Sequence, residues 1–292
     1  FKDFVAKAGE NKLAYLGEAQ LEEMIPHHLG PKVMDALNRV SGGNILAIEQ
    51  YLDFFRNRRF RRTLLVREEL AAGLKRDISA EGLAKFHVAG AFKIEGDSPI
   101  HTTVEQKFTD SEGRNLASTQ PMAKAMMHAL NDAWPETLSV SQWKERAKDR
   151  LKDHPEHLQG ADKLFEEVLV RGFANGLFHV VDEPVQCGPA DAEKPVASPF
   201  ARMRAGKNNR EVSNCWHQTI NLNDLQLALV QLLDGTRDRE AINQAIIEKC
   251  VAGDLKLANN NVPITDRPTI EHLVGQLVPQ AVRDLRRLGL LV

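Results

Sequence analysis

The final segment of the chain carries the most regular pattern in the sequence, with an apolar residue at every third or fourth position over about five helical turns. The residues of this stripe are Ile270, Leu273, Val274, Leu277, Val278, Ala281, Val282, Leu285 and Leu288. Such spacing places the side chains on one face of an α-helix, and Gly289 directly after them is a typical helix end. We therefore expect a long helix that buries one face against neighbouring segments.

Two shorter apolar segments precede this helix and suggest what it packs against. Residues 222–233 and 241–250 are expected to be helices, and Asp238 is well placed to cap the second of them. Residues 290–292 are apolar and would begin a strand. Three helices followed by a strand is the order of a winged-helix domain, which we assign to residues 210–292.

The rest of the chain divides by changes in composition and period. Residues 182–209 contain four prolines and show no period, which is typical of a linker or of an arm that wraps across a neighbouring domain. Residues 75–181 combine short strand-like runs with helical segments, which predicts a small mixed α/β middle domain. Together with a helical N-terminal region, residues 1–74, these parts give an expected fold class of α+β that is predominantly helical.

Three helices are expected within the N-terminal region. Residues 11–24 form a fair amphipathic pattern, residues 32–40 give a second short helix, and a longer helix begins near Asn44. The buried stripe of this last helix is expected to contain Ile45, Ile48, Leu52 and Phe55.

The sequence contains no recognisable catalytic, cofactor-binding or metal site. No two glycines stand at G-x-G spacing, and the P-loop, H-E-x-x-H and G-x-S-x-G motifs are absent. Cys187, Cys215 and Cys250 are too widely spaced for a disulfide framework or a C-x-x-C metal site. No apolar run approaches the roughly 18–20 residues of a membrane helix, and no secretory signal is visible. We expect a module in the reducing cytoplasm that is not catalytic by itself and does not insert into a membrane.

The most unusual local composition follows the third expected helix. Six arginines fall between Arg56 and Arg67, interleaved with Phe60 and preceded by aromatic residues. One interpretation is a solvated face paired with Glu49, Asp53 and nearby glutamates. The other is a contact with a further domain or protein, since guanidinium groups bind carboxylates and phosphates in bidentate fashion. The residues that would make this contact are Tyr51, Arg56, Arg58, Arg59, Arg61 and Arg62.

The winged-helix domain leaves a second function open, that of a DNA-binding regulator. Arg283, Arg286 and Arg287 lie toward the end of the long helix and could meet phosphates. They also suit the negative end of the helix dipole, and no second basic cluster accompanies them. Over the whole chain 38 Lys+Arg oppose 40 Asp+Glu, so charge favours neither nucleic acid nor an anionic membrane as a partner.

Residues 15–19, YLGEA, and above all residues 49–65, EQYLDFFRNRRFRRTLL, resemble a bacterial family. The chain resembles the methyltransferase regulatory domain that follows the S-adenosylmethionine-binding domain in certain bacterial methyltransferases, including the rickettsial type of protein lysine methyltransferase. The long motif covers residues 1 to about 70. The rest of the chain resembles the family only in the order of its regions. A middle region contains Trp134-Pro135, and a winged helix that begins with residues 233–237 follows it.

The resemblance implies a function that the residues alone do not. In this family an upstream domain binds S-adenosylmethionine, while regions like this one regulate it, support dimerisation and help engage a protein substrate. The missing initiator Met and glycine loop are then expected of a chain that lacks its catalytic domain. The cofactor residues of the family have no positions here onto which they could be carried.

Overall fold

The computed structural model describes residues 1–24, 30–74, 78–259 and 262–292. The chain forms two compact units. One comprises Phe1–Asn131 with Ser139–Asp182, and the other comprises Asp132–Leu138 with Glu183–Val292. Helices predominate over short strands in a mixed α/β architecture, which confirms the expected fold class. None of the helices within the described residues is long and apolar enough to cross a membrane.

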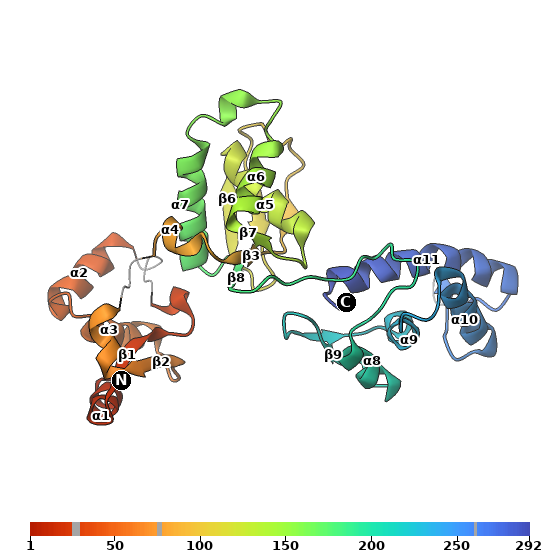
Figure 1. The fold of residues 1–292 in the computed structure, drawn as a ribbon, viewed down its shortest axis with the longest axis horizontal. Helices are drawn as coiled ribbons and strands as arrows, with labels where there is room; N and C mark the ends of the chain where they lie inside the picture. Colours follow the sequence, from red (N-terminus) through yellow and green to blue (C-terminus); the bar gives the residue numbers. More distant parts are fainter. Residues whose placement is uncertain (25–29, 75–77, 260–261) are drawn as a thin grey trace. The chain divides into compact units, whose positions relative to one another are not determined.

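The N-terminal part of the first unit is built around a two-stranded antiparallel ribbon. Its two strands are labelled β1 and β2 in Figure 1, and the ribbon pairs Leu13 with Arg67 at one end and Glu18 with Thr63 at the other. The elements of this part, in chain order, are α1 (Lys2–Glu10), β1 (Leu13–Glu18), the 3-10 helix η1 (Leu21–Glu23), α2 (Pro31–Ser41), α3 (Ile45–Arg56), β2 (Thr63–Arg67) and the 3-10 helix η3 (Glu68–Gly73).

The expected helix over residues 11–24 is wrong. Leu13–Glu18 is strand β1, and the chain then makes only the short turn of η1. The partner strand β2 lies about fifty residues further along the chain, so a local pattern could not reveal the pairing. The expected helices over residues 32–40 and from Asn44 are confirmed as α2 and α3.

The remainder of the first unit contains two small sheets with helices around them. The strand orders are β4-β5-β6 and β7-β3-β8. Trp143 is fully buried here, with edge-on contacts to Phe165 and Phe178. The elements are α4 (Ala80–Leu83), β3 (His87–Ala89), β4 (Lys93–Glu95), β5 (Gln106–Thr109), β6 (Asn115–Ser118), α5 (Pro121–Ala133), β7 (Leu138–Ser139), α6 (Val140–Asp149), the 3-10 helix η4 (Pro155–His157), α7 (Ala161–Ala174) and β8 (His179–Val181).

The second unit contains the long helix that the apolar stripe predicts. This helix, α11, spans Arg267–Arg287, and the Asp266 side chain caps its first turn by accepting from the backbone N–H of Thr269. The other elements are α8 (Pro199–Gly206), β9 (Glu211–Ser213), β10 (Thr219–Asn221), α9 (Asp224–Leu232), α10 (Arg239–Ala252), β11 (Ala258–Asn259) and β12 (Val262–Pro263).

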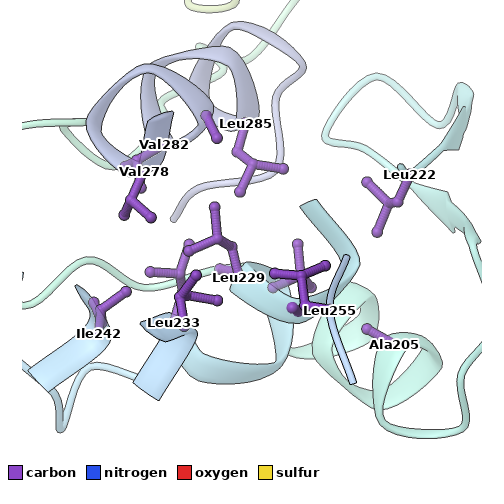
Figure 2. Packing of buried hydrophobic residues seen from close by; sticks show 14 of the residues in the cluster. Ala205, Leu222, Leu229, Leu233, Ile242, Leu255, Val278, Val282 and Leu285 are labelled. Carbon is purple, nitrogen blue, oxygen red and sulfur yellow. The ribbon is translucent and has the colours of Figure 1, made fainter. Parts of the chain in front are cut away.

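The core of this unit lies between α9, α10 and α11. Figure 2 shows Val278, Val282 and Leu285 of α11 above Leu229 and Leu233. Burial of an apolar side chain of this size contributes about 1.5–3 kcal/mol, so this layer supplies much of the unit's stability.

Two segments of the second unit differ from expectation. The region over residues 182–209 is not without structure, because Pro199–Gly206 is helix α8. The expected strand over residues 290–292 is reduced to a single bridge between Leu291 and Ala197. The segment before α8 is held against the winged-helix core by two backbone hydrogen bonds. The N–H of Ala197 donates to the carbonyl of Leu233, and that of Ser198 donates to the carbonyl of Leu290. We call residues 183–198 the arm.

Candidate functional site

The arginine-rich motif forms a tight reversal at the end of α3. Asn57 adopts a left-handed conformation with φ 46° and ψ 43°, which asparagine tolerates better than most residues. The backbone N–H of Arg58 then bonds back to the carbonyl of Asp53 at 2.9 Å. The chain therefore turns back after one residue and brings the following arginines against the last turns of α3.

Arg61 is the centre of a buried cluster of ion pairs. Its guanidinium lies 2.5 Å from a carboxylate oxygen of Glu18, 3.1 Å from one of Glu49 and 2.8 Å from one of Asp53. It also donates to the backbone carbonyl of Glu49 at 2.8 Å and stacks on the ring of Phe1 at 3.7 Å. All five donors of a guanidinium form a fixed planar fork, which suits a site with this many acceptors.

Arg58 belongs to the same cluster. Its side chain is 8% exposed and lies within 4 Å of carboxylate oxygens of Glu23, Glu49 and Asp53. The Glu18 and Glu49 side chains are almost completely buried, at 0% and 2% exposed. A carboxylate that is so deeply buried stays charged at low cost only when it is paired, and Arg58 and Arg61 supply the counter-charges here.

The pKa shifts in the cluster have two opposing causes, which are burial of the charged groups and their pairing with opposite charges. Burial raises the pKa of the Glu49 carboxyl, and the charge and hydrogen bond of Arg61 oppose that rise. Burial also raises the pKa of the Tyr15 hydroxyl, and the charges of Glu49 and Glu18 raise it further. For Arg61 burial lowers the pKa, but the hydrogen bonds to Asp53 and Glu18 outweigh it and the pKa is raised.

The structure separates the six residues of the expected contact into interior and exposed members. Arg58 and Arg61 lie in the cluster just described, and Arg56 donates to the backbone carbonyl of Glu23. Arg62 is half exposed and lies 3.6 Å from Glu23. Tyr51 and Arg59 are exposed.

Three phenylalanines near these residues are more exposed than any arginine of the cluster. Phe54 is 73% exposed, Phe55 58% and Phe60 81%. The expected burial of Phe55 is therefore wrong, and the buried residues of α3 are Glu49 and Leu52. The apolar period of α3 could not show this, because the buried face is completed by carboxylates that pair with arginines beyond the helix. We call Tyr51, Phe54, Phe55, Arg59 and Phe60 the aromatic surface.

A second feature is an apolar groove of about 400 Å³ in the winged-helix unit. Its floor contains Ile242, Val278 and Val282, and the arm supplies one wall. We call it the winged-helix groove; its lining residues are Pro189, Ala190, Asp191, Pro195, Arg239, Ile242, Asn243, Val278, Pro279, Val282, Arg283 and Arg286. Sequence analysis missed it, because the arm and the two helices are far apart along the chain.

Arginines surround the apolar floor. Arg239 donates to the backbone carbonyls of Ala190 and Ala192 and so holds the arm, while Arg283 bonds only to the neutral side chain of Gln280. Arg286 is paired with Glu136 at 2.7 Å. Within the part of the chain that the structure describes, neither Arg239 nor Arg283 has a carboxylate within ion-pair distance, although Asp191 also lines the groove.

Among the described residues 78–181, the most deeply buried ionisable group is a single lysine. Lys124 is completely buried, and its ammonium group donates to backbone carbonyls, including that of Thr102 at 2.7 Å. Burial lowers its pKa. Among the described residues no three histidine, cysteine or acidic side chains lie close enough to hold a metal ion.

Comparisons with known proteins give matches to both ends of the chain. Residues 1–67 match the family model described as "Predicted methyltransferase regulatory domain", and residues 193–290 match that described as "PKMT, C-terminal winged helix domain". The matched regions contain the aromatic surface and most of the winged-helix groove.

Two curated relatives come from Rickettsia prowazekii (strain Madrid E). The uncharacterized protein RP789 is 25% identical over 304 residues, covering 100% of this chain and 53% of that protein. The uncharacterized protein RP027 is 24% identical over 250 residues, covering 80% of this chain and 97% of that protein. The chain thus spans about half the length of the first of these relatives.

Two solved structures share the fold. PKMT2 from Rickettsia typhi superposes with a TM-score of 0.85 at 23% identity, covering 99% of this chain and 58% of that chain. The structure of PKMT2 in complex with AdoHcy gives a TM-score of 0.83 with the same identity and coverage.

Proposed function

We propose that this chain, which carries a methyltransferase regulatory domain and a C-terminal winged-helix domain of the PKMT type, acts as the regulatory, dimerisation and substrate-recognition region of an S-adenosylmethionine-dependent protein lysine methyltransferase. The cofactor then binds a catalytic domain outside these 292 residues, and the protein works in the cytoplasm. The observation that carries the proposal is the match of residues 1–67, which contain the arginine-rich motif, to the regulatory family, together with one curated relative and one solved structure that are nearly twice as long. Dimerisation rests on the resemblance alone.

The aromatic surface is the proposed contact with the catalytic domain. Phe54 and Phe60 expose large apolar rings to solvent next to the cationic Arg59. Exposed aromatic and arginine side chains are enriched at the centres of protein interfaces. The buried cluster below fixes the backbone that presents them, since Arg61 ties the chain after Asn57 to α3. Among the arginines expected at the contact, we therefore assign Arg59 and Arg62 to it, and Arg58 and Arg61 to its support.

The winged-helix groove is the proposed contact with the protein substrate. The arginines at its rim outnumber Asp191, so the groove as a whole suits a segment in which carboxylates stand among apolar residues. A lysine side chain is repelled by the same charges, so the methyl-accepting lysine itself lies elsewhere, at the catalytic domain. This division of tasks is consistent with a region that recruits a substrate without acting on it.

Methyl transfer with and without the catalytic domain tests the proposal. The purified chain is incubated with labelled S-adenosylmethionine and a lysine-containing bacterial protein as methyl acceptor, alone and together with a separately produced catalytic domain. We expect no transfer by the chain alone, and transfer that is stimulated when both are present. Transfer by the isolated chain, or tight binding of S-adenosylmethionine to it in calorimetry, would overturn the proposal.

A further inference from the structure

Two cysteines that are 28 residues apart in the sequence meet in the winged-helix unit. The Sγ atoms of Cys187, in the arm, and Cys215, in the turn between β9 and β10, lie 3.7 Å apart. The third cysteine, Cys250, belongs to the apolar core. Cys187 and Cys215 are both half-buried, so small reagents can reach them.

The turn that carries Cys215 is held firmly on several sides. The Asn214 carboxamide oxygen accepts from the backbone N–H groups of Trp216 and Gln218, both at 2.9 Å. The Cys215 backbone N–H donates to the carbonyl of Gly289 at 3.0 Å. Gly289 leaves room for the thiol, because a Cβ atom at this position would stand 2.7 Å from the Cys215 sulfur.

The arm is also held, by a hydrogen bond to the residues that follow α11. The backbone N–H of Gly188 donates to the carbonyl of Leu291 at 3.3 Å, directly after Cys187. Cys215 and the residue after Cys187 are therefore both hydrogen-bonded to the segment that follows α11. A disulfide has its sulfur atoms about 2.05 Å apart, so closing the bond from the observed 3.7 Å requires the two side chains to rotate toward each other.

The two thiols differ in acidity. The two sulfur atoms share a hydrogen bond in which either thiol can be the donor, and this bond lowers the pKa of Cys215. The same hydrogen bond, followed by burial, raises the pKa of Cys187. A thiol with a lowered pKa beside a second thiol is the arrangement of cysteines that react and are then resolved.

We propose that Cys187 and Cys215 form a redox-active dithiol, a modification site that closes to a disulfide when the chain meets a small disulfide such as oxidised glutathione. The Cys215 thiolate attacks one sulfur of glutathione disulfide, forms a mixed disulfide and releases one glutathione. Cys187 gives up its proton, and its thiolate attacks the Cys215 sulfur and releases the second glutathione. The protein loses two hydrogen atoms with their electrons, and one glutathione disulfide becomes two thiols.

Closure of this bond fixes the start of the arm. Pro189 and Ala190 follow Cys187 closely and line the winged-helix groove, where Arg239 already holds the carbonyl of Ala190. Oxidation therefore makes one wall of the groove rigid. That the groove then binds its partner differently rests on the proposed function, whereas formation of the disulfide does not.

Mass spectrometry of the whole chain after treatment with oxidised glutathione tests the proposal. The intact chain is expected to lose two hydrogen atoms without retaining glutathione, and proteolysis without reductant should yield a peptide pair that contains both cysteines. Cys187→Ser should stop at a stable glutathione adduct on Cys215, whereas Cys250→Ser should behave as the unaltered chain does. Hydrogen exchange of residues 187–197 should slow on oxidation and recover on addition of dithiothreitol.

Four results would overturn it. They are an unmodified chain, a lasting glutathione adduct on the unaltered protein, a disulfide between two chains, and a disulfide that includes Cys250. An adduct that accumulates equally in Cys215→Ser would overturn the assignment of Cys215 as the attacking thiol. These results do not depend on methyl transfer, so failure here leaves the proposed function standing, and failure of that function leaves the dithiol standing.

Discussion

Replacing Arg61 with glutamine tests whether the arginine-rich motif holds its own fold together. The substitution keeps a polar side chain but leaves the carboxylates of Glu18 and Glu49 buried without their main counter-charge. Removing one partner of a buried ion pair costs about 3–5 kcal/mol, because the remaining charge stays out of water. For the unit that comprises Phe1–Asn131 with Ser139–Asp182, such a loss lowers the melting temperature by about 6–20 °C.

Urea denaturation combined with hydrogen exchange measures the effect where it occurs. The backbone amides of Leu13–Glu18 and Thr63–Arg67 report on the β1–β2 ribbon, while those of α11 report on the winged-helix unit and should not change. Arg59→Gln is the matched control, since it removes the same charge two residues away from an exposed side chain. We expect it to change stability by less than about 0.5 kcal/mol.

The pH dependence of the Arg61→Gln variant provides a second check. Burial raises the pKa of Glu49 above the ordinary 4.5, so the folded state takes up a proton before the unfolded chain does as the pH falls. Protonation of Glu49 removes the carboxylate charge that Arg61 no longer balances. The loss of unfolding free energy in the variant, relative to the unaltered chain, should therefore become smaller as the pH falls toward 4.5. If Arg61→Gln and Arg59→Gln cost the same, or the deficit is independent of pH, the cluster does not support the fold.

Three further predictions concern separate parts of the chain. Phe60→Ser should leave the melting temperature unchanged, because the ring is 81% exposed, but weaken binding to the catalytic domain at least tenfold in calorimetry; equal binding would remove Phe60 from the contact. The ammonium groups of Lys144 and Lys148 lower the pKa of Asp162 to about 2, so its contribution to stability is complete above pH 3.8 and is lost as the pH falls toward 2. Thermal melts at acid pH should show less acid sensitivity in Asp162→Asn than in the unaltered chain. Arg283→Gln should reduce binding of an acidic, apolar peptide to the winged-helix unit, measured by fluorescence anisotropy, while the exposed Lys256→Gln should not.

The sequence predicts best those elements whose packing partners are nearby in the sequence, or whose apolar pattern extends over many turns. The stripe from Ile270 to Leu288 occupies so many turns that only a helix can bury it, and α11 agrees with the prediction to within a few residues. Strand β1 was not predictable in this way. It has an amphipathic pattern that fits a helix equally well, and only pairing with Thr63–Arg67 decides the matter.

The candidate sites could be predicted from the sequence only in part. The motif over residues 49–65 identifies the region, but its residue types do not show which arginines are buried. Glu49 reads as a surface residue of α3 until Arg61 is brought against it, because a charge becomes a core residue only through a partner. The contact between Cys187 and Cys215 is hidden for the same reason, since the arm and the turn meet only in the folded unit.

The burial of two arginines explains why a contact surface can stand on so short a motif. A flexible loop after α3 would have to lose its conformational freedom on binding, which weakens association. Here the free-energy cost of ordering residues 57–62 is met during folding, by the pairing of Arg58 and Arg61 with carboxylates of α3 and β1. Phe60 lies between these anchors in the sequence with its ring in solvent, so its backbone is held in place before a partner binds. The buried arginines Arg58 and Arg61 therefore position the backbone that carries the exposed ring of Phe60.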